Sequence, residues 1–148
     1  MKTVLKKLTA TSAIWSTLPL RLAIGVVFIA HGSQKVFGTF SGPGLSKWMT
    51  LTRLAPVPLR PAWLWLAADA LGELIGGLLI FLGLFTRLGA FIICCAMLTA
   101  TIGIHWPHFF ITSNGFEYPL TLIAITVSLL ITGGGDASTD LYLSRRLH

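Results

Sequence analysis

Two acidic residues, one helical turn apart, stand inside an apolar segment of the sequence. Asp69 and Glu73 are four positions apart, so in a helix their carboxyl groups share one face. An ionised acid at the centre of a bilayer costs at least about 2.5 to 3.5 kcal/mol, so it must be protonated, paired, or turned toward a watery cavity. Gly72 and Gly76 flank Glu73 in a G-x-x-x-G spacing that lets another helix backbone approach. We therefore expect the acidic face to point into a helical bundle.

Other polar side chains stand at the ends of the neighbouring apolar segments, where alternating helix directions would bring them into one leaflet. A carboxylate beside imidazole and ammonium groups can transfer protons for a small ligand that enters from the lipid. We predict four catalytic residues on this basis, namely Glu73, His31, Lys35 and Asp69. The side chains predicted to bind the ligand are His105, Glu117, Tyr118 and Gln34.

A purely structural hypothesis competes with this site. Glu73 would then pair with Lys35 or with a histidine and would only hold the helices in register. A haem between His31 and His105 is a further alternative, for which the sequence offers no other support. The sequence has no zinc spacing, nucleotide loop or nucleophile elbow. We therefore predict that this chain alone holds no metal and no cofactor.

The composition indicates which elements must position these residues. Only 11% of the 148 residues are charged and 54% are hydrophobic, whereas soluble domains carry about 25% charged side chains. The net charge of +6 is scattered at the ends of apolar runs, which argues for a lipid bilayer and against nucleic acid as the partner. A helix needs about 17 to 25 apolar residues to cross the bilayer. We predict an all-α protein with one domain over residues 1–148, a bundle of four transmembrane helices at about 18–37, 62–85, 88–106 and 116–132.

The connections and termini leave two questions open and favour one orientation. Residues 38–61 fit either a short interfacial helix or a solvated loop. A signal peptide is the alternative for the first span, but no small-residue cleavage pattern is present. Four spans place both termini on one side, and the excess of basic residues there predicts that they are cytoplasmic. The basic residues compared are Lys2, Lys6, Lys7, Arg21, Arg87, Arg145 and Arg146 on that side, and Lys35, Lys47, Arg53 and Arg60 on the other.

Several of these segments together resemble the DoxX family of small bacterial membrane proteins. The resemblance extends from Arg21 to Leu141, and its most specific part is residues 73–77 (ELIGG) with 83–87 (GLFTR). Residues 137–140 (ASTD) depart from the aromatic-serine-leucine-aspartate ending of the family. The other matching segments are residues 31–38 (HGSQKVFG), 114–118 (NGFEY) and the glycine-rich stretch from residue 133.

The resemblance implies a four-helix protein of the bacterial inner membrane that is linked with quinone-related redox chemistry. Quinone would be the substrate, Glu73 and His31 would handle protons, and Lys35 would stabilise a quinol oxyanion. Electrons would pass to a partner subunit that carries flavin or metal. The alternative is a non-enzymatic membrane subunit that tethers partner proteins, or binds or exports a small molecule. A homo-oligomer is also expected, because glycine-rich helix faces can associate.

Overall fold

The computed structural model describes residues 9–11, 14–51 and 61–147. Four long helices form the bundle: α2 (Thr17–Phe37), α4 (Ala62–Leu82), α5 (Thr86–Ala100) and α6 (Glu117–Thr132). Two short segments extend the α5–α6 connection, the π-helical turn η2 (Thr101–His105) and the 3₁₀ turn η3 (Ile111–Ser113). Helix α3 (Gly44–Trp48) follows α2, and α7 (Thr139–Leu147) follows α6. The described residues contain no strand, so the all-α prediction is confirmed.

Three of the long helices have the length and hydropathy of membrane spans. These are Thr17–Phe37, Ala62–Leu82 and the continuous helix Thr86–His105. Helix α6, Glu117–Thr132, is apolar but has only 16 residues. The predicted spans agree with these bounds to within three residues, and the largest difference is at the end of α4. That helix ends at Leu82 rather than residue 85 because Gly83 takes a left-handed conformation, with φ of 64°.

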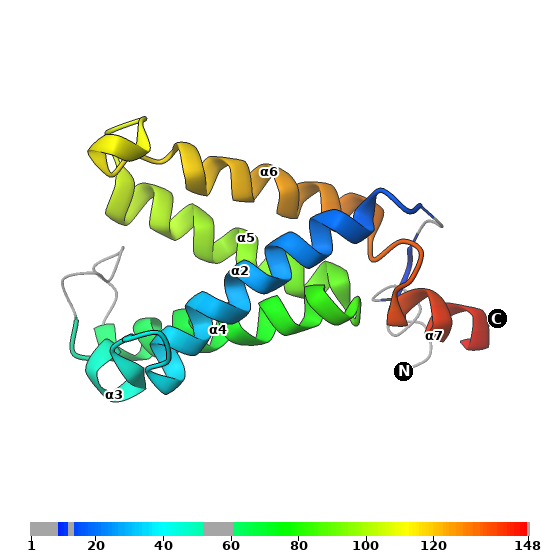
Figure 1. Cartoon of the computed structure of the whole chain (residues 1–148), viewed down its shortest axis with the longest axis horizontal. Helices are drawn as coiled ribbons and strands as arrows, with labels where there is room; N and C mark the ends of the chain where they lie inside the picture. Colours follow the sequence, from blue (N-terminus) through cyan, green and yellow to red (C-terminus); the bar gives the residue numbers. More distant parts are fainter. Residues whose placement is uncertain (1–8, 12–13, 52–60, 148) are drawn as a thin grey trace.

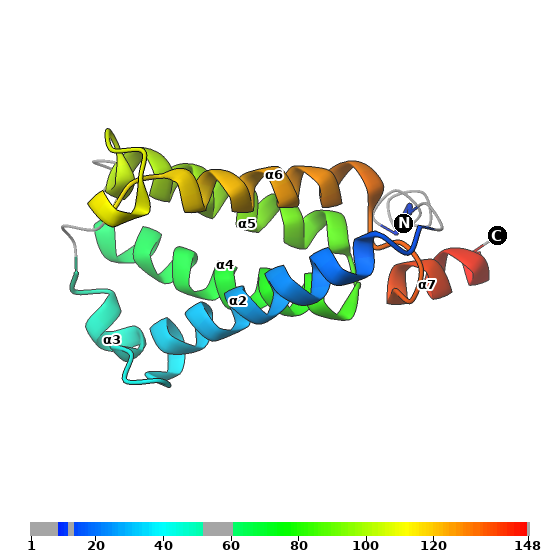
Figure 2. The same ribbon diagram turned by 45° about the horizontal axis from the view of Figure 1, so that its top comes forward.

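The four helices pack as two pairs joined through α4 and α5 (Figures 1 and 2). Glycines make the α2–α4 contact close: a Cβ added to Gly32 would lie 2.5 Å from the backbone nitrogen of Leu74. Gly76 instead meets α5, where an added Cβ would lie 2.9 Å from Ile93. The small residues beside Glu73 therefore let a neighbouring helix approach α4, as the sequence predicts.

A network of hydrogen bonds from Arg21 to backbone oxygens, here called the Arg21 network, closes one end of the bundle. This guanidinium group is 2% exposed and donates hydrogen bonds to backbone carbonyl groups of α4 and of the segment after α6. The acceptors are the oxygens of Ile80 at 3.1 Å, Phe81 at 3.2 Å, Gly134 at 2.9 Å and Ala137 at 3.3 Å. Arg21 thus supplies donors to the last carbonyl groups of α4, of which the Ile80 oxygen also accepts a hydrogen bond from the N–H of Gly83 at 3.1 Å. From the sequence, Arg21 is expected to be a basic residue of the cytoplasmic side and the first residue of the DoxX resemblance, and these contacts are not predicted.

Asp140, after α6, completes the same end of the bundle at the start of α5. Its carboxylate oxygens accept hydrogen bonds from the backbone N–H groups of Phe85 at 2.7 Å and Thr86 at 2.8 Å. The carboxylate therefore caps the N-terminus of α5, where the helix dipole favours negative charge. Although residues 137–140 depart from the family pattern, their aspartate is 1% exposed and built into the bundle.

The connection between α2 and α4 begins with a short helix. Helix α3 has five residues, and Trp48 at its end donates an indole hydrogen bond to the carbonyl oxygen of Leu66 at 3.0 Å. A short helix therefore forms at residues 44–48, and its location at a membrane interface stays a prediction. Residues 52–60, with Arg53 and Arg60, lie outside the described part of the chain. Lys2, Lys6, Lys7 and His148 lie outside it as well.

Candidate functional site

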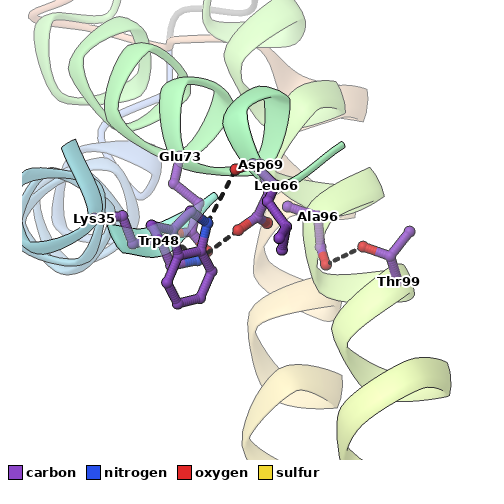
Figure 3. A network of polar contacts seen from close by, with 7 residues as sticks. All are labelled: Lys35, Trp48, Leu66, Asp69, Glu73, Ala96 and Thr99. Carbon is purple, nitrogen blue, oxygen red and sulfur yellow. Dashed lines mark hydrogen bonds and ion pairs between the residues drawn. The ribbon is translucent and has the colours of Figure 1, made fainter. Parts of the chain in front are cut away.

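A three-residue ion cluster joins α2 to α4 at the end of the bundle opposite the Arg21 network. Lys35 Nζ lies 2.7 Å from Asp69 Oδ2 and 2.7 Å from Glu73 Oε2. The Asp69 and Glu73 carboxylates are four positions apart on α4 and approach the ammonium group from the same helix face, as Figure 3 shows. The structural hypothesis, in which Glu73 pairs with Lys35, is therefore realised geometrically.

The two contacts of Lys35 differ in direction although they are equal in length. The contact with Asp69 has the geometry of a hydrogen bond. The contact with Glu73 Oε2 is a charge pair of the same length whose direction is less favourable for a hydrogen bond. One ammonium group thus faces two carboxylates, so the cluster holds one acidic group more than it holds basic groups.

Trp48 covers the remaining side of the ammonium group. Lys35 Nζ lies 4.6 Å from the centre of the Trp48 ring, within the range of a cation–π contact. Because the indole N–H of Trp48 is already donated to Leu66, the ring is fixed in this position. The Lys35 side chain is only 15% exposed as a result, and that of Glu73 only 5%.

A cavity of about 390 Å³ opens beside this cluster, between α4 and α5. Its volume lies in the range of small-molecule sites, about 300 to 1,000 Å³. The polar groups of Lys35, Asp69 and Glu73 occupy one end, and the remaining walls are mostly apolar and aromatic. Side chains of these walls include Trp48, Trp65, Phe91, Ile92, Cys95 and Thr99.

His31 and Gln34 do not line this cavity. His31 precedes Lys35 by one helical turn on α2, is exposed, and makes no hydrogen bond with the residues that the structure describes. The backbone oxygen of Gln34 accepts the hydrogen bond that ends α2, from the N–H of Gly38 at 3.2 Å. The catalytic role of His31 and the binding role of Gln34 therefore remain predictions without a direct contact to the cluster.

The other predicted binding residues belong to the α5–α6 connection. His105 Nδ1 lies 2.8 Å from the backbone oxygen of Asn114. The Glu117 carboxylate accepts a hydrogen bond from the N–H of Ile111 at 2.6 Å, and Tyr118 is 41% exposed. None of the three lines the cavity. In this structure His105 and Glu117 hold the connection together, which leaves a role in ligand entry as a prediction.

The sequence does not predict the aromatic and small residues that line the cavity. Phe91 and Thr99 look like ordinary span residues, and Trp48 and Trp65 are expected only at the outer membrane interface, which amphipathic rings prefer. A usable signal exists in the spacing of Phe91, Cys95 and Thr99, which recur every four residues on one face of α5. Nothing in that spacing alone tells a cavity wall from a lipid-facing surface.

Comparisons with known proteins agree with this architecture. The family model described as DoxX matches residues 16–106, which include α2, α4, α5 and the ion cluster. The chain belongs to the DoxX family. A Bacillus subtilis (strain 168) DoxX relative is 30% identical over 133 residues, which cover 86% of each chain, and is named "Putative oxidoreductase CatD". No solved structure matches the chain. The protein is thus a DoxX-family membrane protein with a distant relative named as an oxidoreductase.

Proposed function

We propose that this DoxX protein binds a quinone-class ligand from the membrane and serves as a component of a quinone-linked redox or redox-stress system. The observation that carries the proposal is the cavity of about 390 Å³ with one ionic end and aromatic walls. Small-molecule sites combine mostly apolar walls with a few placed polar groups in this way. A quinone ring matches the flat aromatic walls, and its oxygen atoms match the ionic end.

The ion cluster suits the proton chemistry that a quinol requires. A quinol that gives up two electrons also releases two protons, so a nearby base favours the oxidation. Glu73 and Asp69 are the bases within the cavity, and Lys35 holds them in place. The electrons need an acceptor, and we propose a partner subunit that carries flavin or metal. The printed name of the Bacillus subtilis relative supports an oxidoreductase system.

We further propose that the protein lies in the bacterial inner membrane with cytoplasmic termini. Arg21 is buried in its hydrogen-bond network and Lys35 in the ion cluster, so neither counts as a basic loop residue under the positive-inside rule. The end of the bundle that holds the Arg21 network still carries basic residues, Arg87, Arg145 and Arg146, which support a cytoplasmic location of that end under the same rule. Reporter fusions after residue 147 test this orientation, because an alkaline phosphatase fusion should be inactive and a fluorescent-protein fusion bright.

Ligand binding to the purified full-length protein tests the redox proposal directly. Quenching of tryptophan fluorescence by a short-chain ubiquinone and its quinol should saturate, because Trp48 and Trp65 line the cavity. Ala68→Phe adds a ring at the cavity wall and should weaken binding at least tenfold, whereas Leu71→Phe on the exposed face of α4 should not. Absence of saturable binding of either form to folded protein would overturn the redox proposal and favour the tethering role.

A further inference from the structure

The polar end of the cavity offers a ligand hydrogen-bond acceptors and almost no free hydrogen-bond donors. An ammonium group has three N–H donors. Lys35 directs its ammonium group at Asp69, at Glu73 and at the face of the Trp48 ring. No donor of Lys35 is therefore left over for a ligand, which argues against the predicted contact between this lysine and a quinol oxyanion.

Most other donors around the cavity are also in use or weak. The indole N–H of Trp48 is given to Leu66, and the hydroxyl of Thr99 donates to the oxygen of Ala96 at 2.8 Å. Cys95 has only a weak S–H donor. Trp65 also lines the cavity, but it is 45% exposed in the first turn of α4 and so belongs to the open edge of the site.

Acceptors, in contrast, are available. Glu73 lines the cavity and meets Lys35 through Oε2, at 2.7 Å, which leaves its second carboxylate oxygen without a hydrogen-bond donor among the described residues. Asp69 accepts one hydrogen bond, through Oδ2, from the described residues. The cluster also carries two carboxylates for one ammonium group, so it favours a ligand without negative charge.

From this donor and acceptor inventory we propose that the cavity selects the reduced, hydroxyl-bearing form of its ligand. A quinol hydroxyl would donate a hydrogen bond to Glu73 or Asp69, and the ring would lie against the aromatic walls. A quinone has acceptor oxygens only, so it would donate no hydrogen bond to either carboxylate and would place its carbonyl oxygen near both of them. This inference rests on the proposed quinone-class function and specifies which redox form the site binds.

Paired titrations of ubiquinol-1 and ubiquinone-1 against the full-length protein in lipid nanodiscs test the selectivity. The quinol is kept reduced under anaerobic conditions, and binding is measured from tryptophan quenching and by equilibrium dialysis. We expect the quinol to bind at least about tenfold more tightly, as a hydrogen bond to a charged acceptor would give. Equal affinities, or tighter quinone binding, would overturn the selectivity and leave the quinone-class function intact. Binding of neither form would overturn both proposals.

Amide variants make the test specific to the acceptors. Glu73→Gln and Asp69→Asn keep the side-chain size but replace one carboxylate oxygen by an N–H donor. Each variant should lower the quinol preference at least fivefold, mainly through tighter quinone binding, while Leu71→Phe on the exposed face of α4 should keep it. Circular dichroism and gel filtration verify that the variants fold, and two amide variants are made so that one misfolded protein does not end the test. An unchanged preference in a folded amide variant would overturn the assignment of the acceptors.

Discussion

Lys35 of α2 and Glu73 of α4 lie 2.7 Å apart, Nζ to Oε2, and connect the two helices inside the predicted bilayer region. The glycine contact between Gly32 and Leu74 lies immediately beside this pair in both helices. Close backbone packing and ion pairing therefore act at the same level of the α2–α4 interface. Stability and ligand binding can be separated there, because different substitutions remove the packing, the charge or the cavity.

Lys35→Met should destabilise the protein strongly. It leaves two carboxylates side by side and mostly buried, and breaking a buried pair typically costs about 3 to 5 kcal/mol. Thermal unfolding in detergent, followed by circular dichroism, measures the loss. Adding Asp69→Asn and Glu73→Gln to the same chain should recover part of it, since the amides carry no charge. A triple variant no more stable than Lys35→Met would count against charge imbalance as the cause.

Gly32→Ala should weaken the α2–α4 interface. The new Cβ would lie 2.5 Å from a backbone atom of α4, which cannot move without shifting the helix, and overpacking of this kind costs about 1 to 3 kcal/mol. Gly72→Ala is the matched control, because its Cβ would meet only the Ile92 Cγ2 atom at 3.2 Å. Unfolding temperatures of the two variants should differ clearly, and similar values would show that the contact at Gly32 is not tight.

Arg21→Lys should be poorly tolerated although it keeps the charge. Lysine lacks the planar fork that reaches four carbonyl groups at once. The Phe81 and Ala137 oxygens would lose their donor, at about 1 to 3 kcal/mol each, whereas the Ile80 and Gly134 oxygens keep a second donor, from Gly83 N–H and Thr17 Oγ1. Asp140→Asn retains the shape of the α5 cap and should cost less, at most about 2 kcal/mol. The yield of monodisperse protein and the unfolding temperature rank the two variants. If Asp140→Asn were the less stable of the two, this account of the Arg21 network would be contradicted.

The two adjacent cysteines provide a probe of the cavity. Cys95 lines it and is exposed, whereas Cys94 is 8% exposed on the neighbouring face of α5. N-phenylmaleimide should therefore modify Cys94→Ser protein at least tenfold faster than Cys95→Ser protein, as measured by intact mass. Bound quinol should slow the reaction at Cys95. Equal rates in the two variants would argue that the cavity does not admit an aromatic molecule.

Hydropathy predicted the helices well because a lipid-exposed span must be apolar along its whole length. The residues 17–37 and 62–82 are marked in this way by composition alone. The pairing of Lys35 with Glu73 could also be anticipated, since a charge inside a span needs a partner. In physical terms, these predictions depend on the cost of placing polar groups in lipid and not on details of packing.

The remaining features depend on contacts between distant parts of the chain. The partners of Arg21 are backbone carbonyl groups, which carry no sequence signal, and one of them lies at residue 134. Trp48 reaches Lys35 because a five-residue helix turns it back over α2, which hydropathy cannot show. His31 and Lys35 are one turn apart, yet only Lys35 faces the cavity. Because residues four positions apart share one helix face, the sequence alone does not tell which of the two reaches the cavity.

The Arg21 network has a consequence for biosynthesis. The ribosome delivers Arg21 to the membrane with the first helix, but Gly134 and Asp140 emerge only after the last one. Until then the guanidinium group and the start of α5 lack the partners found in the mature protein. The nascent chain must therefore keep this end in contact with water, lipid headgroups or the insertion machinery, and release from that machinery becomes coupled to completion of translation.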